Sequence, residues 1–312
     1  MISCTEFIAA YSELFRFLDD KYGRAEVDKL WEFLFAPTGK GIPLINFVKR
    51  DGIKGCVDYW SGTLTEESAD VTFIYNLKDG WLYKEMHHCP SKGRLLALKE
   101  THGIEPYRDY CDHCDYYRAA LEKEGLTWIR NHLAVGEAGC SSLIWDPKVF
   151  DGVMRMNENT VTKEFHSSEN EYFHPDFHSS MNMGIEYVGK THGEEDVKAY
   201  FRTFALSVYK KVIADIKGRS LDALKDFIQK TYKAEKAPDA LAVSLSDDTL
   251  TVSVAFCPAV RHLRSTGREV SRWFSLSTSS VMEALANAAG LSFVMEAYNE
   301  ETGAAKYSFS KK

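Results

Sequence analysis

The sequence predicts an α+β fold made of two tandem repeats, each an antiparallel four-stranded sheet backed by helices. The first observation is internal similarity, because the stretch that begins at Phe7 resembles the stretch that begins 170 positions later at Phe177. The second is a Cys-Pro pair in each copy, Cys89-Pro90 and Cys257-Pro258. The third is a shared order of patterns, in which helical periodicity comes first and strand alternation follows.

The repeated stretch can be followed along the chain. Lys21-Tyr22-Gly23-Arg24-Ala25-Glu26-Val27 corresponds to Thr191-His192-Gly193-Glu194-Glu195-Asp196-Val197, and Gly125-Leu126 corresponds to Gly290-Leu291. In contrast, Tyr110-Cys111-Asp112-His113-Cys114 returns as Leu276-Ser277-Thr278-Ser279-Ser280. The two copies therefore share a scaffold and differ in their sulfur ligands.

Each copy begins with helices. The first helix is predicted from apolar residues that recur with a helical period, namely Phe7, Ile8, Tyr11, Leu14, Phe15 and Leu18. It ends at Tyr22-Gly23. A second helix is predicted for residues 25–35, and the second copy has predicted helices at 177–190, 194–217 and 221–232.

Strands follow the helices in both copies. Hairpins are predicted around Lys78-Asp79-Gly80 and around Ser246-Asp247-Asp248. A proline directly after each cysteine suits the first turn of a new helix. The predicted strands are 71–75, 81–86, 126–133 and 140–145 in the first copy and 240–245, 249–256, 291–298 and 306–309 in the second, with further helices at 109–124 and 278–289.

These patterns divide the chain into a cysteine-rich repeat at residues 1–150, a polar, turn-rich linker at 151–176 and a second repeat at 177–312. With 312 residues, of which 45% are hydrophobic, each half can build its own core. The formal net charge of −7 argues against a nucleic-acid partner, because no basic cluster compensates for it.

The apolar runs argue against a membrane partner, since none approaches the roughly 20 residues that a span requires. The first residues lack a basic, leader-like pattern, so we expect a cytoplasmic protein. Gly-rich phosphate loops, G-x-S-x-G and H-E-x-x-H are also absent from the sequence, which argues against nucleotide-dependent, serine-esterase and zincin chemistry.

The seven cysteines are the main candidates for chemistry. Their odd number and the expected reducing compartment favour metal binding or thiol chemistry over disulfides. The sharpest set is Cys89, Cys111, Cys114 and Cys140. Such converging thiolates suit tetrahedral zinc, the expected cofactor, ahead of an iron–sulfur cluster. His87, His88 and His113 are alternative ligands, and burial as small apolar residues is the alternative interpretation.

Cys89 is also a candidate catalytic nucleophile. A cysteine at a helix N-terminus has its pKa lowered by the helix dipole, which favours the thiolate. Packing alone is the alternative for both Cys-Pro cysteines. It is favoured for Cys257, which has no neighbouring cysteines.

His174 and His178 form a second candidate cluster, beside Phe165-His166-Ser167-Ser168. They are four residues apart around the start of a predicted helix, a spacing that can chelate a metal or pair a base with a substrate. The position of His178 holds Ile8 in the first copy, so we expect His178 to point inward and assign it a catalytic acid–base role. Alternatively, Asp176 caps that helix and His174 is exposed in the linker.

The order of these parts resembles the L-2-amino-thiazoline-4-carboxylic acid hydrolase family of bacteria, whose members often carry a histidine on the first helix, as at His178. The architecture is also similar to vinyl-reductase-type small-molecule-binding domains, some of which hold a structural zinc through cysteines. The matching pieces are Tyr22-Gly23-Arg24-Ala25-Glu26, Cys89-Pro90, Tyr110-Cys111-Asp112-His113-Cys114-Asp115, Gly139-Cys140-Ser141-Ser142-Leu143, His192-Gly193-Glu194-Glu195, Cys257-Pro258 and Ala305-Lys306-Tyr307-Ser308-Phe309.

Two functions follow from these resemblances. The first is a small-molecule hydrolase of a C–N or C=N bond in a heterocyclic or amidine-like substrate, with a Cys-held metal or the Cys89 thiolate supplying the nucleophile and His178 as acid or base. The second is a small-molecule or metal-binding sensor or accessory protein with a structural zinc. A homodimer is compatible with either function. Within one chain we expect the two halves to pack as a pseudo-twofold pair.

Overall fold

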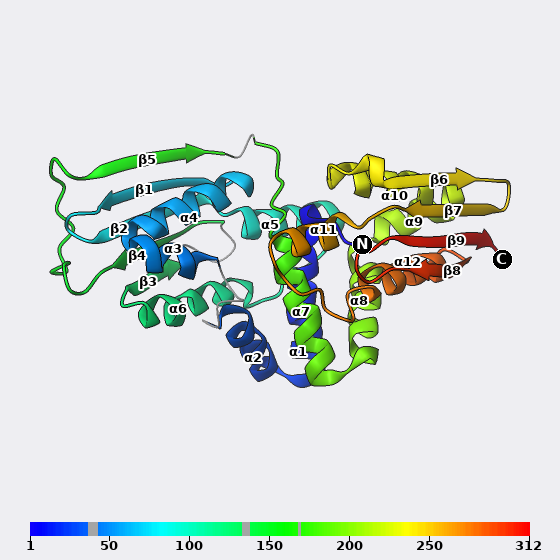
Figure 1. Cartoon of the computed structure of the whole chain (residues 1–312), viewed down its shortest axis with the longest axis horizontal. Coiled ribbons are helices and arrows are strands. Elements are labelled where there is room, and N and C mark those ends of the chain that lie inside the picture. The colour runs from blue at the N-terminus through cyan, green and yellow to red at the C-terminus, as the bar shows by residue number, and fades with distance from the viewer. Residues whose placement is uncertain (37–42, 133–137, 168–169) are drawn as a thin grey trace. The chain divides into compact units, whose positions relative to one another are not determined.

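The computed structural model describes residues 1–36, 43–132, 138–167 and 170–312, and it confirms the α+β class (Figure 1). The chain forms two compact units. Unit 1 consists of Met1–Glu26, His102–Ile104 and Pro175–Lys312, and unit 2 consists of Val27–Thr101 and Glu105–His174. Leu133, at the end of a predicted strand, and Ser168 lie outside the described residues.

Unit 2 consists of groups of helices that are each followed by consecutive strands. The predicted helix at 109–124 is two pieces, a 3-10 helix and then an α-helix, and the helices at 44–66 were not predicted. The elements are α2 (Arg24–Phe35), α3 (Leu44–Asp51), α4 (Ile53–Glu66), β1 (Asp70–Asn76), β2 (Trp81–His88), α5 (Pro90–His102), η2 (Tyr110–Tyr116), α6 (Tyr117–Lys123), β3 (Thr127–His132), β4 (Cys140–Trp145) and β5 (Val161–His166).

The sheet of unit 2 has five antiparallel strands rather than the predicted four, in the order β3-β4-β2-β1-β5. The additional strand β5 pairs with β1, from Asp70 opposite His166 to Tyr75 opposite Val161. It lies within residues 151–176, which their polarity had suggested to be a linker. Polar residues are compatible with an edge strand, because its open side faces water.

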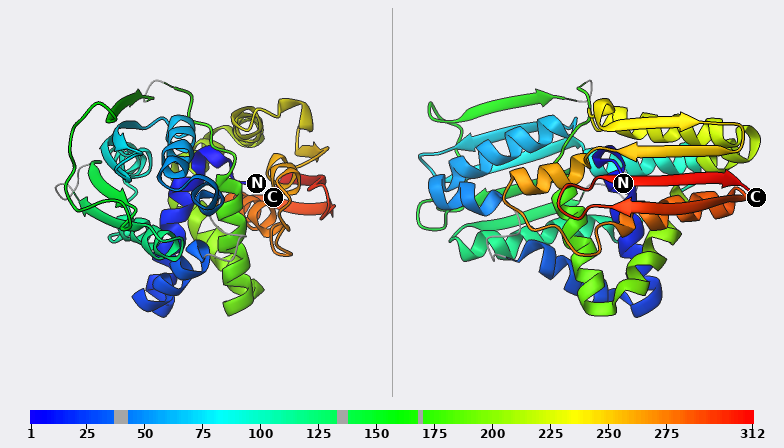
Figure 2. Two further views of the ribbon diagram at one scale, coloured as in Figure 1. Left: turned by 60° about the vertical axis from the view of Figure 1, so that its left-hand side comes forward. Right: turned by 45° about the vertical axis from the view of Figure 1, so that its right-hand side comes forward.

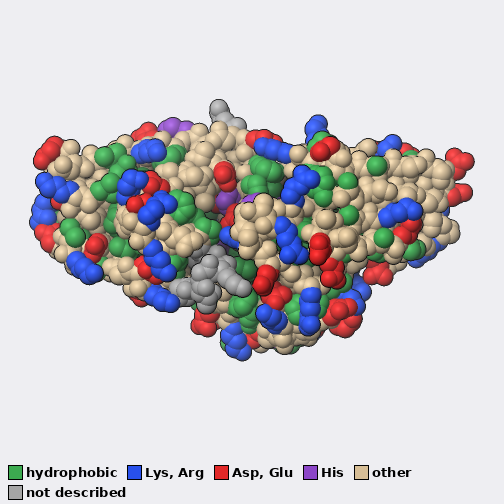
Figure 3. All heavy atoms as spheres, viewed as in Figure 1, with side chains coloured by type: hydrophobic (Ala, Val, Ile, Leu, Met, Phe, Trp, Pro, Cys, Tyr) green, Lys and Arg blue, Asp and Glu red, His purple; other side chains and the backbone are tan. Residues whose placement is uncertain are grey.

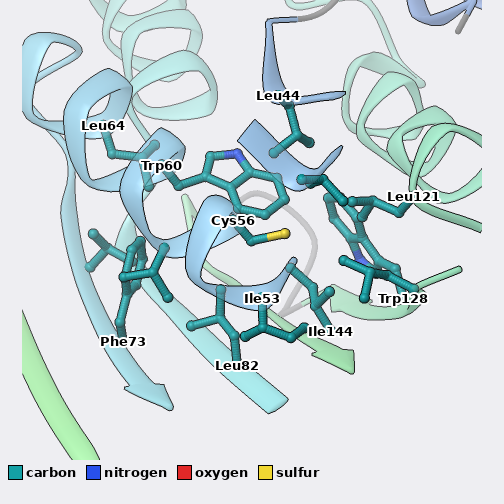
Figure 4. Packing of buried hydrophobic residues seen from close by; sticks show 14 of the residues in the cluster. Leu44, Ile53, Cys56, Trp60, Leu64, Phe73, Leu82, Leu121, Trp128 and Ile144 are labelled. Carbon is teal, nitrogen blue, oxygen red and sulfur yellow. The ribbon is translucent and has the colours of Figure 1, made fainter. Parts of the chain in front are cut away.

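The core of unit 2 lies between its helices and this sheet (Figure 4). Trp60 of α4 meets Trp128 of β3 edge to face, with ring centroids 5.5 Å apart. Cys56 is fully buried in the same cluster, so it packs as a small apolar residue. Each large apolar side chain buried here contributes about 1.5–3 kcal/mol to the stability of the unit.

Unit 1 contains most of the second half of the chain and the first helix. The predicted helix at 194–217 is interrupted at Tyr209 and forms α8 and α9. The elements are η1 (Cys4–Glu6), α1 (Phe7–Tyr22), α7 (Phe177–His192), α8 (Glu194–Val208), α9 (Lys210–Arg219), α10 (Leu221–Ala234), η3 (Pro238–Ala240), β6 (Leu241–Leu245), β7 (Thr249–Val254), α11 (Pro258–Ser265), α12 (Leu276–Ala288), β8 (Leu291–Tyr298) and β9 (Ala305–Lys311).

The sheet of unit 1 has the four antiparallel strands that were predicted, in the order β6-β7-β9-β8. Helices α10 and α12 pack against it (Figure 2). Side chains alternate accordingly along β7, where Leu250, Val252 and Val254 are buried. This period of two is that of a strand with one face toward a core.

Helix α1 packs in unit 1 rather than with the other residues of the predicted 1–150 repeat. Helix α1 lies beside α7 (Figures 1 and 2). The Phe7 and Phe177 rings stack with centroids 4.4 Å apart, and the Tyr22 and His192 rings stack at 3.9 Å. This contact buries the apolar stripe of α1, which explains why the helix packs against α7 and not against the residues that follow it in the sequence.

One face of the chain is mixed in charge. On the face drawn in Figure 3, Lys and Arg side chains are interspersed with Asp and Glu over both units. Among the helices in the described ranges, none combines the length and the apolar composition that crossing a bilayer would need.

Candidate functional site

His178 lies in the first turn of α7 and is buried, with 4% of its surface exposed. The prediction that it points inward is confirmed. Its Nε2 atom lies 2.9 Å from Oε2 of Glu235, the residue that directly follows α10. The end of one helix thus brings a carboxylate to the beginning of another.

Glu235 is a hydrogen-bond acceptor for several groups. The backbone N–H of Cys4 donates to Oε1 with an N–O distance of 2.6 Å, and the His178 ring donates to Oε2. Burial raises the pKa of Glu235, but the hydrogen bond and charge of His178, together with hydrogen bonds from the Cys4 N–H and the Ser3 side chain, outweigh it and lower the pKa to about 2. The carboxylate is therefore ionised at neutral pH. When the His178 ring carries a single proton, this carboxylate favours that proton on Nε2 and leaves the lone pair on Nδ1.

Cys4 brings a third donor to this position. It lies in η1 with 1% of its surface exposed. Its Sγ atom, a ring nitrogen of His178 and a carboxylate oxygen of Glu235 all lie within 4.8 Å of one another. Within the described ranges, no other three Cys, His, Asp or Glu side chains come together in this way. One sulfur, one nitrogen and one oxygen are donors that zinc accepts.

His178 is a predicted site residue, whereas Cys4 and Glu235 were not predicted from the sequence. One local signal could have placed Cys4, because Ser3 and Glu6 form a capping box at the start of the first helices. Glu235 has no such signal, since its partners His178 and Cys4 are 57 and 231 positions away in the sequence.

Further polar groups surround this centre in unit 1. Tyr209 donates its hydroxyl to Oε2 of Glu6 at 2.9 Å, and burial raises the pKa of Glu6. Cys257 is buried with its Sγ 3.3 Å from Sδ of Met1. Burial raises the pKa of Cys257, and the charge of Glu235 raises it further. The surroundings therefore favour neutral groups, and Glu235 is held ionised by its own hydrogen bonds.

His174 does not share the partner of His178. Its Nδ1 lies 2.6 Å from Oε2 of Glu66 in unit 2, and it is buried rather than exposed. Asp176 makes no capping bond from its side chain to the backbone of α7. It instead accepts a hydrogen bond from the Ser179 hydroxyl at 2.9 Å.

The structure gathers the four predicted cysteine ligands in one region of unit 2. Cys89 follows β2, Cys111 and Cys114 share one side of η2, and Cys140 begins β4. All four are free and half-buried, and the other three each act electrostatically on the Cys89 thiol. No three of their Sγ atoms lie within 4.8 Å of one another in the described structure, so a shared metal would require them to move closer.

The expected thiolate character of Cys89 is wrong for this structure. Burial raises the pKa of the Cys89 thiol far above its ordinary value, although the Lys92 N–H contacts its Sγ at 3.5 Å. Burial likewise raises the pKa of Cys111, to about 11. The cost of desolvating the thiolate thus outweighs the stabilisation that was expected from the helix dipole at the start of α5.

Lys84 is an unexpected neighbour of these cysteines. It is 7% exposed, and its Nζ lies 4.1 Å from the centroid of the Trp60 ring and 5.6 Å from that of Trp128. Burial lowers the pKa of Lys84, and the charges of Cys140 and Cys114 oppose this. No carboxylate in the described ranges makes an ion pair with Lys84. Cation–π contacts contribute about 2 kcal/mol when desolvated, less than the several kcal/mol that burying an ammonium costs.

Of the three alternative histidine ligands, His113 has a ring nitrogen close to a cysteine sulfur. Its Nδ1 donates to the carbonyl oxygen of Tyr110, and its Nε2 lies 3.6 Å from Sγ of Cys114. Burial lowers the pKa of His113 to about 4, so the ring is neutral. His87 instead pairs with the Thr72 hydroxyl at 2.8 Å, and His88 packs over Gly93.

No family model, no curated protein and no solved structure matches this chain. The function therefore has to be inferred from its side chains.

Proposed function

We propose that this chain is a hydrolase that opens a C–N or C=N bond in a small heterocyclic or amidine-like molecule. We place its catalytic centre at Cys4, His178 and Glu235. The observation that carries this proposal is the buried His178–Glu235 pair with a thiol beside it. A buried carboxylate next to an imidazole orients the ring and stabilises its protonated form, as in many hydrolases.

The proposed reaction uses both ring nitrogens of His178. Water adds to the electrophilic carbon while Nδ1 accepts its proton, and the ionised Glu235 stabilises the imidazolium that forms. The imidazolium then gives that proton to the leaving nitrogen. The C–N bond breaks as the hydroxyl of the adduct becomes the carbonyl, and the remaining hydroxyl proton passes through Nδ1 to the departing amine. The products are a carbonyl compound and an amine. The low dielectric around these buried groups strengthens the attraction between imidazolium and carboxylate.

The test is a screen of cyclic amidines, thiazolines and imidazolines, with ring opening followed by NMR and by release of free thiol or amine. Once one compound is turned over, His178→Asn should lower kcat/KM by about 10²–10⁴-fold, because it removes the proton acceptor. Glu235→Gln should lower it by at least about tenfold through loss of orientation.

The matched control is His192→Asn. His192 forms the same kind of pair in unit 1, with its Nε2 2.9 Å from Oε1 of Glu26, but it lies outside the proposed centre. We expect this variant to keep its activity. A folded His178→Asn variant with wild-type kcat/KM would contradict the proposal.

We also propose that the chain arose by tandem duplication. Tyr22 donates its hydroxyl to Asp196, and the corresponding residue His192 pairs with Glu26, which corresponds to Asp196. Such reciprocal contacts are characteristic of an isologous interface. The two sheets support the same proposal, because without β5 the order β3-β4-β2-β1 matches β8-β9-β7-β6.

The second candidate function is a binding module with a structural zinc at Cys89, Cys111, Cys114 and Cys140, as in vinyl-reductase-type domains. The specific observation that favours it is Lys84, a buried ammonium that thiolates on a metal would neutralise. Elemental analysis and an absorption spectrum test it. A colourless protein that contains zinc, and that loses this zinc in a Cys111→Ser variant, would support the second function. A brown chromophore, or a zinc content in that variant equal to that of the wild type, would contradict it.

A further inference from the structure

We infer that Cys4, His178 and Glu235 bind a divalent transition-metal ion, and that zinc is the ion their donors fit best. Its role as a catalytic cofactor rests on the proposed hydrolase function, whereas metal binding itself does not. The three side chains come from η1, from the first turn of α7 and from the end of α10. The fold of unit 1 therefore assembles them from distant parts of the sequence.

The separations suit a small ion. Zinc bonds of about 2.0–2.3 Å place the donors of a tetrahedral site roughly 3.3–3.8 Å apart. The three donors here already lie within 4.8 Å of one another. Nε2 of His178 lies 2.9 Å from Oε2 of Glu235, and the hydrogen-bond proton lies between these two atoms. Exchange of that proton for a metal ion requires only small side-chain shifts.

The charges also match. The Cys4 thiolate and the Glu235 carboxylate together carry two negative charges, and the neutral His178 ring adds none. A divalent cation bound by these groups gives a neutral centre. Neutrality matters here because the three residues are only 1%, 5% and 4% exposed, and an uncompensated buried charge is costly.

The second buried histidine–glutamate pair of unit 1 lacks this donor set. His192 and Glu26 are also 2.9 Å apart, but the neighbour of Glu26 is the hydroxyl of Tyr187, which donates to it at 2.6 Å. A tyrosine hydroxyl completes a hydrogen-bond network, whereas a cysteine thiol adds a soft metal ligand. The Cys4 sulfur is therefore the feature that singles out the His178 centre.

The number of ligands indicates what the ion does. Three protein ligands leave the fourth tetrahedral position to water, which is the arrangement of catalytic rather than structural zinc. A zinc-bound water ionises near neutral pH, and in the zinc-loaded protein it would take the place of the water activated by His178 as the nucleophile of the same hydrolysis.

The test is titration of the metal-free chain with Co²⁺, which reports thiolate ligation by a sulfur-to-cobalt charge-transfer band and tetrahedral geometry by its visible bands. All proteins in this titration carry Cys111→Ser and Cys114→Ser, so that unit 2 offers fewer thiolate ligands to Co²⁺. Cys4→Ser should lose the charge-transfer band. His178→Asn and Glu235→Gln should bind Co²⁺ at least about tenfold more weakly.

His192→Asn is the control and should bind Co²⁺ as the parent does. Equal binding by the Cys4, His178 and Glu235 variants would overturn the inference. Metal binding without turnover of any screened compound would leave the inference standing and count against the hydrolase.

A measurement on the unaltered chain covers the case in which the variants fail to fold. The ¹¹³Cd NMR shift depends on the number of sulfur ligands, so a site with one sulfur is separated from one with three or four. We expect a resonance of the one-sulfur type. Its absence from cadmium-saturated protein would overturn the inference.

Discussion

Nε2 of His178 and Oε2 of Glu235 lie 2.9 Å apart in the interior of unit 1. The pair joins the first turn of α7 to the end of α10, and the backbone of Cys4 adds a further hydrogen bond to the same carboxylate. Each group is costly to bury alone, so each depends on the other. This dependence gives the pair a structural consequence besides its proposed chemistry.

Removal of either partner should destabilise the metal-free chain. We expect Glu235→Ala and His178→Ala each to lower the free energy of unfolding by about 3–5 kcal/mol, because each leaves a buried group without its partner. Urea denaturation followed by circular dichroism measures this. The double variant should lose less than the sum of the two losses. Losses below about 1 kcal/mol for both single variants would contradict the buried pairing.

Acid should weaken a second contact in unit 1. Burial raises the pKa of Asp196, but hydrogen bonds from Lys21 and Tyr22 outweigh it and hold the pKa below 3.8. Because the pKa in the folded state is the lower one, this contribution to stability is present above about pH 3.8 and is lost as the pH falls through the folded value. Unfolding measured between pH 2 and 6, roughly the range in which carboxylates titrate, should show a shallower acid dependence for Asp196→Asn. An unchanged profile would contradict it.

Cys89 should be a poor nucleophile in the metal-free protein. Its raised pKa leaves little thiolate at neutral pH, so alkylation by iodoacetamide at pH 7 should be at least about 100-fold slower than that of a cysteine peptide. Mass spectrometry of the peptide that contains Cys89 gives the rate. Fast labelling of Cys89 in the native protein would restore its proposed nucleophilic role.

The Phe7–Phe177 stack predicts a measurable coupling between helices α1 and α7. Phe→Ala at either position should destabilise the protein, by up to about 3–5 kcal/mol where the ring is fully buried. The double-mutant cycle should give a coupling of about 0.5–1.5 kcal/mol for the ring pair. Strictly additive effects would show that the two rings do not interact.

Separation of the chain near residue 160 should disrupt unit 1, because α1 would be lost from it. A fragment of residues 175–312 is expected to lack a cooperative unfolding transition, since the face of α7 that Phe7 covers would be exposed. Addition of a peptide of residues 1–26 should restore part of the transition. A fragment that unfolds cooperatively without the peptide would contradict this prediction.

Local patterns in the sequence predicted much of the fold. The period of Phe7, Ile8 and Tyr11 identified α1, and alternation identified most of the strands. The same patterns could not show that α1 packs in unit 1, because an apolar stripe predicts that a helix face is buried but not which element covers it. They also missed β5, whose polar residues occupy an edge that water covers on one side.

The candidate site was predicted only in part. The comparison of His178 with Ile8 identified a buried polar residue, and the structure supplies Glu235 as its partner. Cys4 and Glu235 reach His178 through the tertiary fold, so no spacing in the sequence marks them. The pKa of Cys89 differs from the prediction because desolvation of the thiolate, which depends on the tertiary structure, outweighs the local helix dipole.

The tautomer of His178 in the metal-free protein tests the proposed centre most directly. Long-range ¹H–¹⁵N NMR of the imidazole rings distinguishes a proton on Nε2 from one on Nδ1. We expect the Nε2–H form, held by the Glu235 carboxylate. We also expect both ring-nitrogen shifts of His178, but not those of His192, to change when Zn²⁺ is added. A proton on Nδ1, or a His178 ring that Zn²⁺ leaves unchanged, would contradict the proposed centre.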